Sequence, residues 1–410
     1  MQAADLGPVP AEARTQSPLD LFLIFVGANI VATTLVTGAS LVPAFSVTEA
    51  FVLIALGTVV GSALVAALAP VGPRLGVPSV VAMRAAVGFP GATALAALLY
   101  VTNFAWIALN NVIAASACAR VWGGPASEKA WTIGLGLLAT AVVAAGPRAV
   151  GYADRVAVPL MAVTGVVFAW RAAGLPADVW RAAGTHTMPW WRGLDVVVAY
   201  QVSWILMFAD YSRYTASARR GLVAVFLGLT LSSLWFMPLG ALAGRAAGGP
   251  DPGAMVDALH LGIAGALLIA LGTVTTNFVN IYLSALAWKS LIPRASDAAS
   301  VWSIGIVGAA LSLLSRSWLD RYADLMIVLG GLLVPVGGIL LARFVLERRP
   351  VDVAALYDRS GPYGRGRFAA AALAWTLGAI TYFAAERIGG TLPALVVAGA
   401  AYRVLATRAT

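Results

Sequence analysis

Aromatic, amide and hydroxyl residues recur inside four apolar segments of this 410-residue chain. Trp106 and Asn110 are four residues apart, so they share one face if their segment is helical. Gln201 and Trp204 lie in a second segment, and the run Thr275-Thr276-Asn277 lies in a third. An aromatic face stacks on a flat ring, and an amide supplies a donor and an acceptor to the edge of that ring. These residue types favour binding of a flat, neutral, hydrogen-bonding molecule.

The segments that carry these residues belong to a chain whose composition suits lipid rather than water. Hydrophobic residues make up 60% of the chain and charged residues 11%, whereas about a quarter of a soluble domain is charged. The apolar runs are roughly 18–25 residues long, which is the length a helix needs to cross a bilayer. The ~10-residue alternation of barrel strands is absent from the sequence. The sequence therefore predicts an all-α integral membrane protein.

About twelve transmembrane helices are expected. With the N-terminus inside, most of the 27 Lys and Arg residues fall in cytoplasmic segments, so both termini are predicted to be cytoplasmic in a multi-pass protein of the plasma membrane. The expected spans are 19–43, 50–70, 91–119, 131–145, 157–173, 196–212, 222–242, 263–286, 302–314, 325–346, 369–384 and 392–405.

Polar residues at bilayer depth are concentrated in the first, third, sixth and eighth spans, although such residues are costly in lipid. If spans 1–5 and 6–10 are two inverted copies, spans 1 and 6 are equivalent, and so are spans 3 and 8. Inverted-repeat transporters place substrate and ion sites at the midplane, on interrupted helices in matching positions. The pattern favours a transport site over simple packing by small and hydroxyl residues. Its members include Gly27, Thr33, Thr34, Asn103, Asn111, Tyr200, Ser203, Thr273 and Tyr282 beside the residues named above.

The domain organisation follows from these spans. Residues 1–18 are predicted to form a cytoplasmic tail, 19–346 a ten-helix inverted-repeat transport core, 347–368 a cytoplasmic loop, and 369–410 two additional helices and a tail. Residues 72–91 are predicted to contain a helix at the cytoplasmic interface, and residues 175–191 an outer surface segment.

Other protein classes fit the residues less well. No Asp, Glu, Lys or His lies at the expected midplane of the four polar spans, and His186 and His260 fall in outer segments. A membrane enzyme is not supported, since no metal-ligand cluster or catalytic dyad is visible, and a channel lacks the required rings of charges or carbonyls. The net charge of +9 does not predict nucleic-acid binding, because the Arg residues lie in short loops that orient a membrane protein. Cys118 is expected to be a buried, inert thiol.

Several motifs, in the right order along most of the chain, resemble the nucleobase–cation symporter-1 family of cytosine/purine permeases, and in particular its cytosine-permease-like branch. They are Gly27-Ala28-Asn29, the run 72–79 with Arg84-Ala85 and Gly88-Phe89, Trp204 with Asp210-Tyr211-Ser212-Arg213-Tyr214, Thr276-Asn277 with Asn280-Ile281-Tyr282, the run 335–342, and Leu356-Tyr357 with Gly361-Pro362-Tyr363.

The resemblance implies a leucine-transporter-type 5+5 inverted repeat plus two C-terminal helices, working as a monomer. It implies that Trp106 and Trp204 sandwich a heterocycle whose edge is read by amides, namely Asn110, Gln201, Asn277, Asn280 and Asn29. It also implies a Na⁺ site formed by carbonyls near Ala28 and Val31, by Gly272, and by the hydroxyls of Thr275 and Thr276. Na⁺ prefers oxygen ligands, whereas proton coupling would more usually need a carboxylate or His relay; H⁺ stays an alternative.

The chain departs from the family pattern at two positions, and the substrate stays open. Arg343 stands where relatives often have an acidic residue, and Asn110 stands where they often have the longer Gln. The expected substrate is a neutral nucleobase of the cytosine or purine type, taken up with a cation. A hydantoin or a thiamine-precursor pyrimidine is an alternative, as is an amino acid carried by the same architecture. Asp210 is expected to pair with Arg213 or a loop arginine and to secure the inner end of span 6.

Overall fold

The computed structural model of the chain describes residues 6–292, 294–314, 316–347, 349–365 and 367–407. Within these residues the chain forms helices and no strand, apart from one isolated bridge between Gln16 and Thr215. The longer helices are α1 (Pro18–Asn29), α3 (Val47–Leu68), α6 (Arg84–Val121), α7 (Glu128–Ala144), α8 (Pro147–Ala173), α10 (Trp190–Val202), α11 (Ala218–Ala247), α13 (Gly262–Leu291), α14 (Asp297–Ser312), α16 (Tyr322–Leu341), α17 (Phe368–Ala384) and α18 (Thr391–Thr407).

Short helices connect or extend these elements. The short α-helices are α2 (Ala32–Ala39), α4 (Val71–Leu75), α5 (Ser79–Ala82), α9 (Ala177–Arg181), α12 (Pro252–Ala258) and α15 (Arg316–Asp320). Single turns of 3-10 or π-helix are η1 (Ala11–Ala13), η2 (Pro125–Ser127), η3 (Ser203–Met207), η4 (Ser212–Tyr214), η5 (Ala342–Leu346) and η6 (Ala355–Tyr357).

The described helices have the length and composition of membrane spans. Six of them, α3, α6, α8, α11, α13 and α16, are long and apolar enough to cross a bilayer, and α1 with α2 forms a bent seventh candidate. Helices α14, α17 and α18 are apolar but shorter. The predicted all-α membrane architecture is confirmed, whereas the count of twelve spans and the 5+5 repeat stay predictions.

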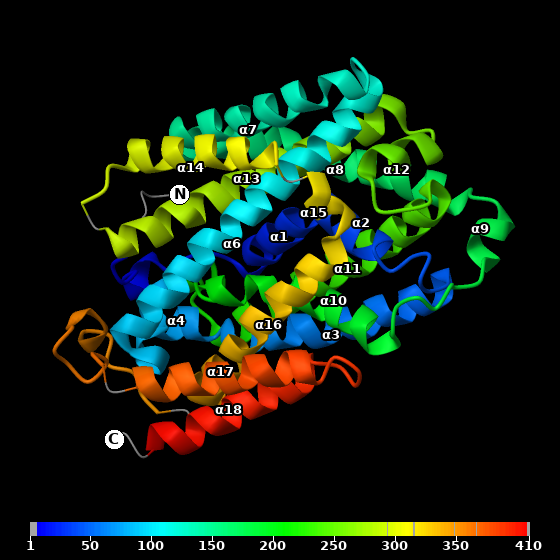
Figure 1. Cartoon of the computed structure of the whole chain (residues 1–410). Helices are drawn as coiled ribbons and strands as arrows, with labels where there is room; N and C mark the ends of the chain where they lie inside the picture. Colours follow the sequence, from blue (N-terminus) through cyan, green and yellow to red (C-terminus); the bar gives the residue numbers. More distant parts are fainter. Residues whose placement is uncertain (1–5, 293, 315, 348, 366, 408–410) are drawn as a thin grey trace.

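Segments from both halves of the chain meet at one end of the bundle. The Val9 N–H donates to the Gly76 carbonyl at 2.8 Å, and the Tyr357 hydroxyl donates to the Leu6 carbonyl at 2.6 Å. Figure 1 shows α4, the loop 349–365 and the last turn of α18 at this end, with α9 at the other. The predicted tails and loop also include residues 1–5, 348, 366 and 408–410, which lie outside the described residues.

The first span is broken near its middle, as its Gly and Thr residues led us to expect. A capping box between Ser17 and Asp20 starts α1, which ends at Asn29. Val31 is extended, at φ −140° and ψ 163°, and α2 then continues at 59° to α1. A helix end leaves its last carbonyls without partners inside the helix, so the break exposes polar backbone at this position.

The sixth span is also interrupted, without any glycine or proline in the sequence to indicate it. Helix α10 ends at Val202, and the chain continues as the tighter 3-10 turn η3. The Ser203 hydroxyl donates to the Tyr200 carbonyl at 2.6 Å, which supplies that carbonyl with a side-chain partner at the junction. Spans 1 and 6 are therefore both discontinuous.

Most of the segment after α3 is buried within the protein, and its expected position at the cytoplasmic interface stays a prediction. Ser79, at the start of α5, is fully buried; its hydroxyl accepts from the Ala209 N–H at 2.8 Å, and its N–H donates to Asp210 at 3.3 Å. Its apolar residues pack against the protein, next to Ala209 and Asp210 at the end of the sixth span. Asp210 secures that end by binding the backbone of α5. Gly88, at φ 69°, kinks the start of α6 where the loop 349–365 docks.

Candidate substrate and ion site

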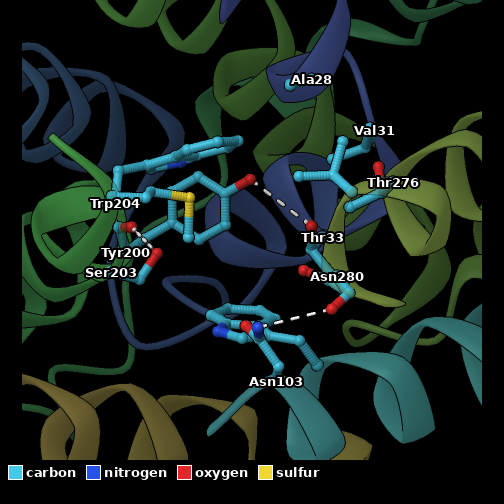
Figure 2. A pocket seen from close by; sticks show the side chains of 12 residues that line it. Ala28, Val31, Thr33, Asn103, Tyr200, Ser203, Trp204, Thr276 and Asn280 are labelled. Carbon is cyan, nitrogen blue, oxygen red and sulfur yellow. Dashed lines mark hydrogen bonds between the residues drawn. The ribbon is translucent and has the colours of Figure 1, made fainter. Parts of the chain in front are cut away.

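One pocket gathers residues from all four polar spans, beside the two interruptions (Figure 2). Helices α6 and α13, the third and eighth spans, pack directly against each other and form one side of it. None of the lining residues carries a charge. They are Ala28, Val31 and Thr33 from the first span, Asn103 and Trp106 from α6, Tyr200, Ser203, Trp204 and Met207 from α10 and η3, and Thr276, Val279 and Asn280 from α13.

Three aromatic residues form walls of the pocket. Trp204 is only 9% exposed, and its ring centroid lies 5.7 Å from that of Phe25, which supports it from behind. Trp106 lies edge-on to Tyr200, with centroids 6.1 Å apart and planes at 85°. Trp204 is buried and Trp106 is partly buried, and each indole has a flat face on which a ring can stack. The structure thus places both predicted stacking residues in the pocket lining.

Two amides line the pocket, and one of them was predicted to bind substrate. Asn280 donates to Asn277 Oδ1 at 3.3 Å, and Asn103 donates to the Asn280 main-chain carbonyl at 3.4 Å. Figure 2 shows Asn103 and Asn280 on the side of the pocket away from Trp204. An edge-on contact to a ring held beside Trp204 would therefore come from these amides.

Asn110 and Asn277 lie outside the lining and belong to an amide cluster with Asn111 and Ser312. Asn277 Oδ1 accepts from Asn110 at 3.0 Å as well as from Asn280, and its Nδ2 donates to Asn111 at 2.8 Å and to the Ile107 carbonyl at 3.4 Å. Asn111 donates onward to Ser312 at 3.0 Å. A side-chain amide makes four hydrogen bonds, so Asn277 has no capacity left for a ligand.

Asn29 and Gln201, also predicted to read the substrate edge, instead bind α11. Asn29 Nδ2 donates to Ser232 Oγ at 2.8 Å and to Ser233 Oγ at 2.6 Å, and Gln201 Nε2 donates to Ser233 Oγ at 2.6 Å. Both side chains are completely buried, and neither lines the pocket. Their geometry joins the first and sixth spans to the seventh.

Three of the five residues predicted for the ion site, Ala28, Val31 and Thr276, line the pocket at the first-span break. Gly272 lies one turn before Thr276, and a Cβ there would approach the Ile30 carbonyl to 3.3 Å, so α13 passes close to the break. Thr275 donates to the Leu271 carbonyl at 3.0 Å and Thr276 to the Gly272 carbonyl at 2.7 Å. These bonds use the hydroxyl protons and leave oxygen lone pairs that a cation could use.

Six lining residues were given no substrate or ion role from the sequence, although the first four belong to the polar pattern of the four spans: Thr33, Asn103, Tyr200, Ser203, Met207 and Val279. Helical spacing carried a signal for some of them. Asn103 precedes Trp106 by three residues, and Tyr200 precedes Trp204 by four, which places each pair on one helix face. Thr33 follows the break directly and could have been found from its position there.

Comparison with known proteins agrees with this geometry. A family described as "Permease for cytosine/purines, uracil, thiamine, allantoin" matches residues 8–403. The chain is 24% identical over 383 residues to the putative purine-cytosine permease YxlA of Bacillus subtilis, covering 87% of this chain and 82% of that one. It is 26% identical over 352 residues to the cytosine permease of Escherichia coli, covering 84% and 81%.

The fold is similar to that of Mhp1, a nucleobase-cation-symport-1 family transporter solved in a closed conformation with bromovinylhydantoin bound. The TM-score is 0.79 at 20% identity, covering 98% of this chain and 95% of that one. A helical bundle with two interrupted spans around an uncharged pocket defines the class as a multi-pass membrane transporter, not an enzyme. The chain belongs to the cytosine/purine permease family, and the predicted family is confirmed.

Proposed function

We propose that this permease carries a neutral nucleobase, of the cytosine or purine type, into the cell together with Na⁺. The observation that carries the proposal is the pocket itself, in which Trp106 and Trp204 offer flat faces and Asn103 and Asn280 offer amides. A flat ring with donors and acceptors on its edge matches both features. Asn110, Gln201, Asn277 and Asn29 are then supporting residues rather than contacts to the base.

Related heterocycles are the first alternative for the substrate. A hydantoin and a thiamine-precursor pyrimidine share the flat ring and the polar edge, and the family description includes thiamine and allantoin beside the nucleobases. An amino acid would bring a charged carboxylate and ammonium into a lining that has no charged side chain. Helix ends at the break could hold a carboxylate, but two tryptophans and two amides favour a heterocycle.

Sodium coupling is proposed from the oxygens that surround the break. Carbonyls near Ala28 and Val31, with the Thr275 and Thr276 hydroxyls beside Gly272, supply the hard oxygen ligands that Na⁺ takes. The charge of the ion would meet the exposed carbonyl end of α1, which is favourable. Proton coupling is the alternative, and it would more usually use a carboxylate or a histidine, neither of which is among the described lining residues.

The architecture proposed for this function is a plasma-membrane monomer with twelve spans and both termini cytoplasmic. We propose that the core, residues 19–346, is a 5+5 inverted repeat, that residues 1–18 and 347–368 are cytoplasmic, and that residues 369–410 add two helices. Matching interruptions in spans 1 and 6, and direct packing of spans 3 and 8, support the repeat.

A ligand panel tests the function directly. Purified protein would be melted with cytosine, adenine, hypoxanthine, uracil, hydantoin and phenylalanine, each with NaCl or with choline chloride. Binding stabilises the folded state by mass action, so a nucleobase should raise the melting temperature, and more so in sodium. Stabilisation by phenylalanine alone would contradict the nucleobase proposal, and a shift that depends on pH but not on sodium would contradict the ion proposal.

The double substitution Thr275→Ala and Thr276→Ala tests the ion site. Sodium should tighten base binding in the wild type by roughly 5- to 150-fold, the range usual for coupled sites, and the double variant should lose this effect while still folding. Thr140→Ala is the matched control, because Thr140 is buried and also donates to its own helix, at Gly136, away from the pocket. Sodium dependence that survives in the double variant would exclude these hydroxyls as ligands.

A further inference from the structure

The Tyr200 side chain connects the pocket to the break between α1 and α2 through hydroxyl groups. Its oxygen lies 2.6 Å from Thr34 Oγ1 and 3.4 Å from Thr33 Oγ1. Thr34 Oγ1 donates to the main-chain carbonyl of Asn29 at 2.6 Å. Figure 2 shows the Tyr200 hydroxyl directed across the pocket toward Thr33. Tyr200 lines the pocket although it is only 3% exposed, so its hydroxyl is shielded from bulk water.

The direction of these hydrogen bonds follows from the number of protons available. A threonine hydroxyl has one proton and two acceptor lone pairs. A carbonyl only accepts, so Thr34 uses its proton on Asn29. Tyr200 must then be the donor in its 2.6 Å bond to Thr34. Because that bond uses the one phenolic proton, the Tyr200 oxygen offers the pocket lone pairs only.

The same chain of bonds reaches the proposed ion site. Asn29 is the last residue of α1, and its neighbours Ala28 and Val31 line the pocket at the break. The Thr34 hydroxyl therefore holds a carbonyl in place within the backbone that would surround the cation. A hydrogen bond that polarises its neighbour strengthens the next one in the chain, so a contact made to Tyr200 also acts on the Thr34–Asn29 bond.

We propose that Tyr200 is a specificity-determining residue that accepts a hydrogen bond from an N–H group of the carried heterocycle. Thr34 acts through Tyr200: it takes the phenolic proton, fixes the acceptor role, and joins the substrate to the break in the first span. The inference rests on the proposed function of the pocket as a nucleobase site. The Tyr200 oxygen would then favour bases that present an N–H group to α10 over analogues whose nitrogen at that position is methylated or carries no proton.

A double-mutant cycle tests the chain from Tyr200 to Thr34. Cytosine and adenine binding would be measured on full-length protein bearing Tyr200→Phe, Thr34→Val, or both, with melting temperatures to establish folding. Tyr200→Phe should weaken binding of the carried base roughly 3- to 10-fold, as expected for one neutral hydrogen bond, and Thr34→Val somewhat less. The double variant should bind like Tyr200→Phe alone, because Thr34 has no route to the base without the phenol.

Thr37→Val is the matched control for this cycle. Thr37 is a buried hydroxyl of the same helix that bonds to Tyr322 at 2.7 Å and does not line the pocket, so its loss should leave affinity unchanged. Full additivity of the Tyr200 and Thr34 effects would overturn the link, since it would make Thr34 an independent structural residue. If either single variant fails to fold, the other still decides whether its hydroxyl contributes to affinity.

Methylated bases test the acceptor role. Affinity for cytosine should fall in Tyr200→Phe, whereas affinity for the derivative that has no N–H at the contacting nitrogen, 1-methylcytosine or N4,N4-dimethylcytosine, should stay unchanged. Unchanged cytosine binding with improved binding of both derivatives would overturn the proposal, because the hydroxyl would then act by size alone. A wild-type protein that binds no nucleobase would refute the function itself, and unaffected variants of a binding wild type would refute only the role of Tyr200.

Discussion

The pocket lining and the amide cluster lie next to each other and both draw on α6 and α13, yet they differ in how their polar and aromatic groups are used. The lining also takes residues from the first and sixth spans, and the cluster takes Ser312 from α14. In the amide cluster, Asn277 is bonded at all four of its positions, to Asn110, Asn111, Asn280 and the Ile107 carbonyl. In the lining, the aromatic faces of Trp106 and Trp204 border open space. An amide such as Asn277, whose donors and acceptors are all used, holds helices together, whereas faces that border open space can bind a ligand. Among the three amides of the cluster, Asn110 Oδ1 is the one oxygen that is buried without a hydrogen-bond partner.

The difference has a physical reason in the cost of polar groups in lipid. An amide buried without partners costs free energy, so two helices that both carry amides gain by pairing them. The pairing leaves Asn280 as the member that reaches both the cluster and the pocket. The cluster therefore positions an amide of the site while making no contact with substrate itself.

The largest expected effect is on the lining side of this comparison. Trp204→Ala should weaken base binding by about 1–3 kcal/mol, roughly 5- to 150-fold, if stacking here resembles base stacking on other proteins. Trp204→Phe should retain part of the affinity, because it keeps a smaller aromatic face. The measurement is equilibrium binding together with the melting temperature.

Trp131→Ala is the control for the loss of an indole. Trp131, on α7, contacts Trp122 in a tilted arrangement, with ring centroids 5.8 Å apart, and is not part of the lining, so its removal should leave base affinity unchanged. If Trp204→Ala lowers the melting temperature but binds base normally, Trp204 serves only to pack against Phe25.

In the amide cluster we expect a substitution to lower the stability of the protein more than its affinity for the base. Asn277→Ala leaves Asn110 and Asn111 without their partner, and should lower stability by about 1–2 kcal/mol. Base affinity of the folded variant should fall less than in Trp204→Ala, because only the support of Asn280 is lost. Reversible unfolding measures the loss of stability, and binding at a temperature where the variant is folded measures the loss of affinity separately. A loss of affinity larger than that of Trp204→Ala would place the cluster in the binding site.

The smallest effect concerns the edge of the substrate. Asn103→Ala removes one amide from the lining and should weaken binding by about 0.5–1.5 kcal/mol, the usual worth of one neutral hydrogen bond. Thr102→Ala is its neighbouring control, since the Thr102 hydroxyl donates to the Leu99 carbonyl of its own helix and does not line the pocket. Equal losses of affinity in the two variants would remove Asn103 from the list of contacts.

The sequence predicted the spans that meet at the site better than it predicted the side chains that line it. Hydropathy places helices because burial in lipid is an average over many residues. Asn103 and Asn110 both lie within about 60° of Trp106 around an ideal helix, so the pattern cannot separate them. Along the helix axis, Asn103 lies about 5 Å before Trp106 and Asn110 about 6 Å after it. Of the two, only Asn110 pairs with Asn277. Which of the two asparagines lines the pocket and which joins the amide cluster therefore depends on the neighbouring helix α13.

The helix interruptions in the first and sixth spans also differ in how well the sequence predicts them. Gly27 and the threonines announce the break in the first span, and the structure has it between Asn29 and Ala32. The change to a 3-10 turn at Ser203 has no comparable residue signal, and η3 packs there against α5 and α16, which lie far from it in sequence. Likewise, residues 72–91 were predicted to contain a surface helix, and only the packing of Ser79 against Ala209 and Asp210 shows that this part of the segment is buried.

The central claim is that the heterocycle binds in the pocket and not in the amide cluster, and a heavy-atom label tests it most directly. Crystals of the protein grown with 5-bromocytosine and NaCl would be measured at the bromine absorption edge. We expect one anomalous peak in the space lined by Trp106, Trp204 and Asn280. A peak among Asn110, Asn111 and Asn277, with the pocket empty, would contradict the account.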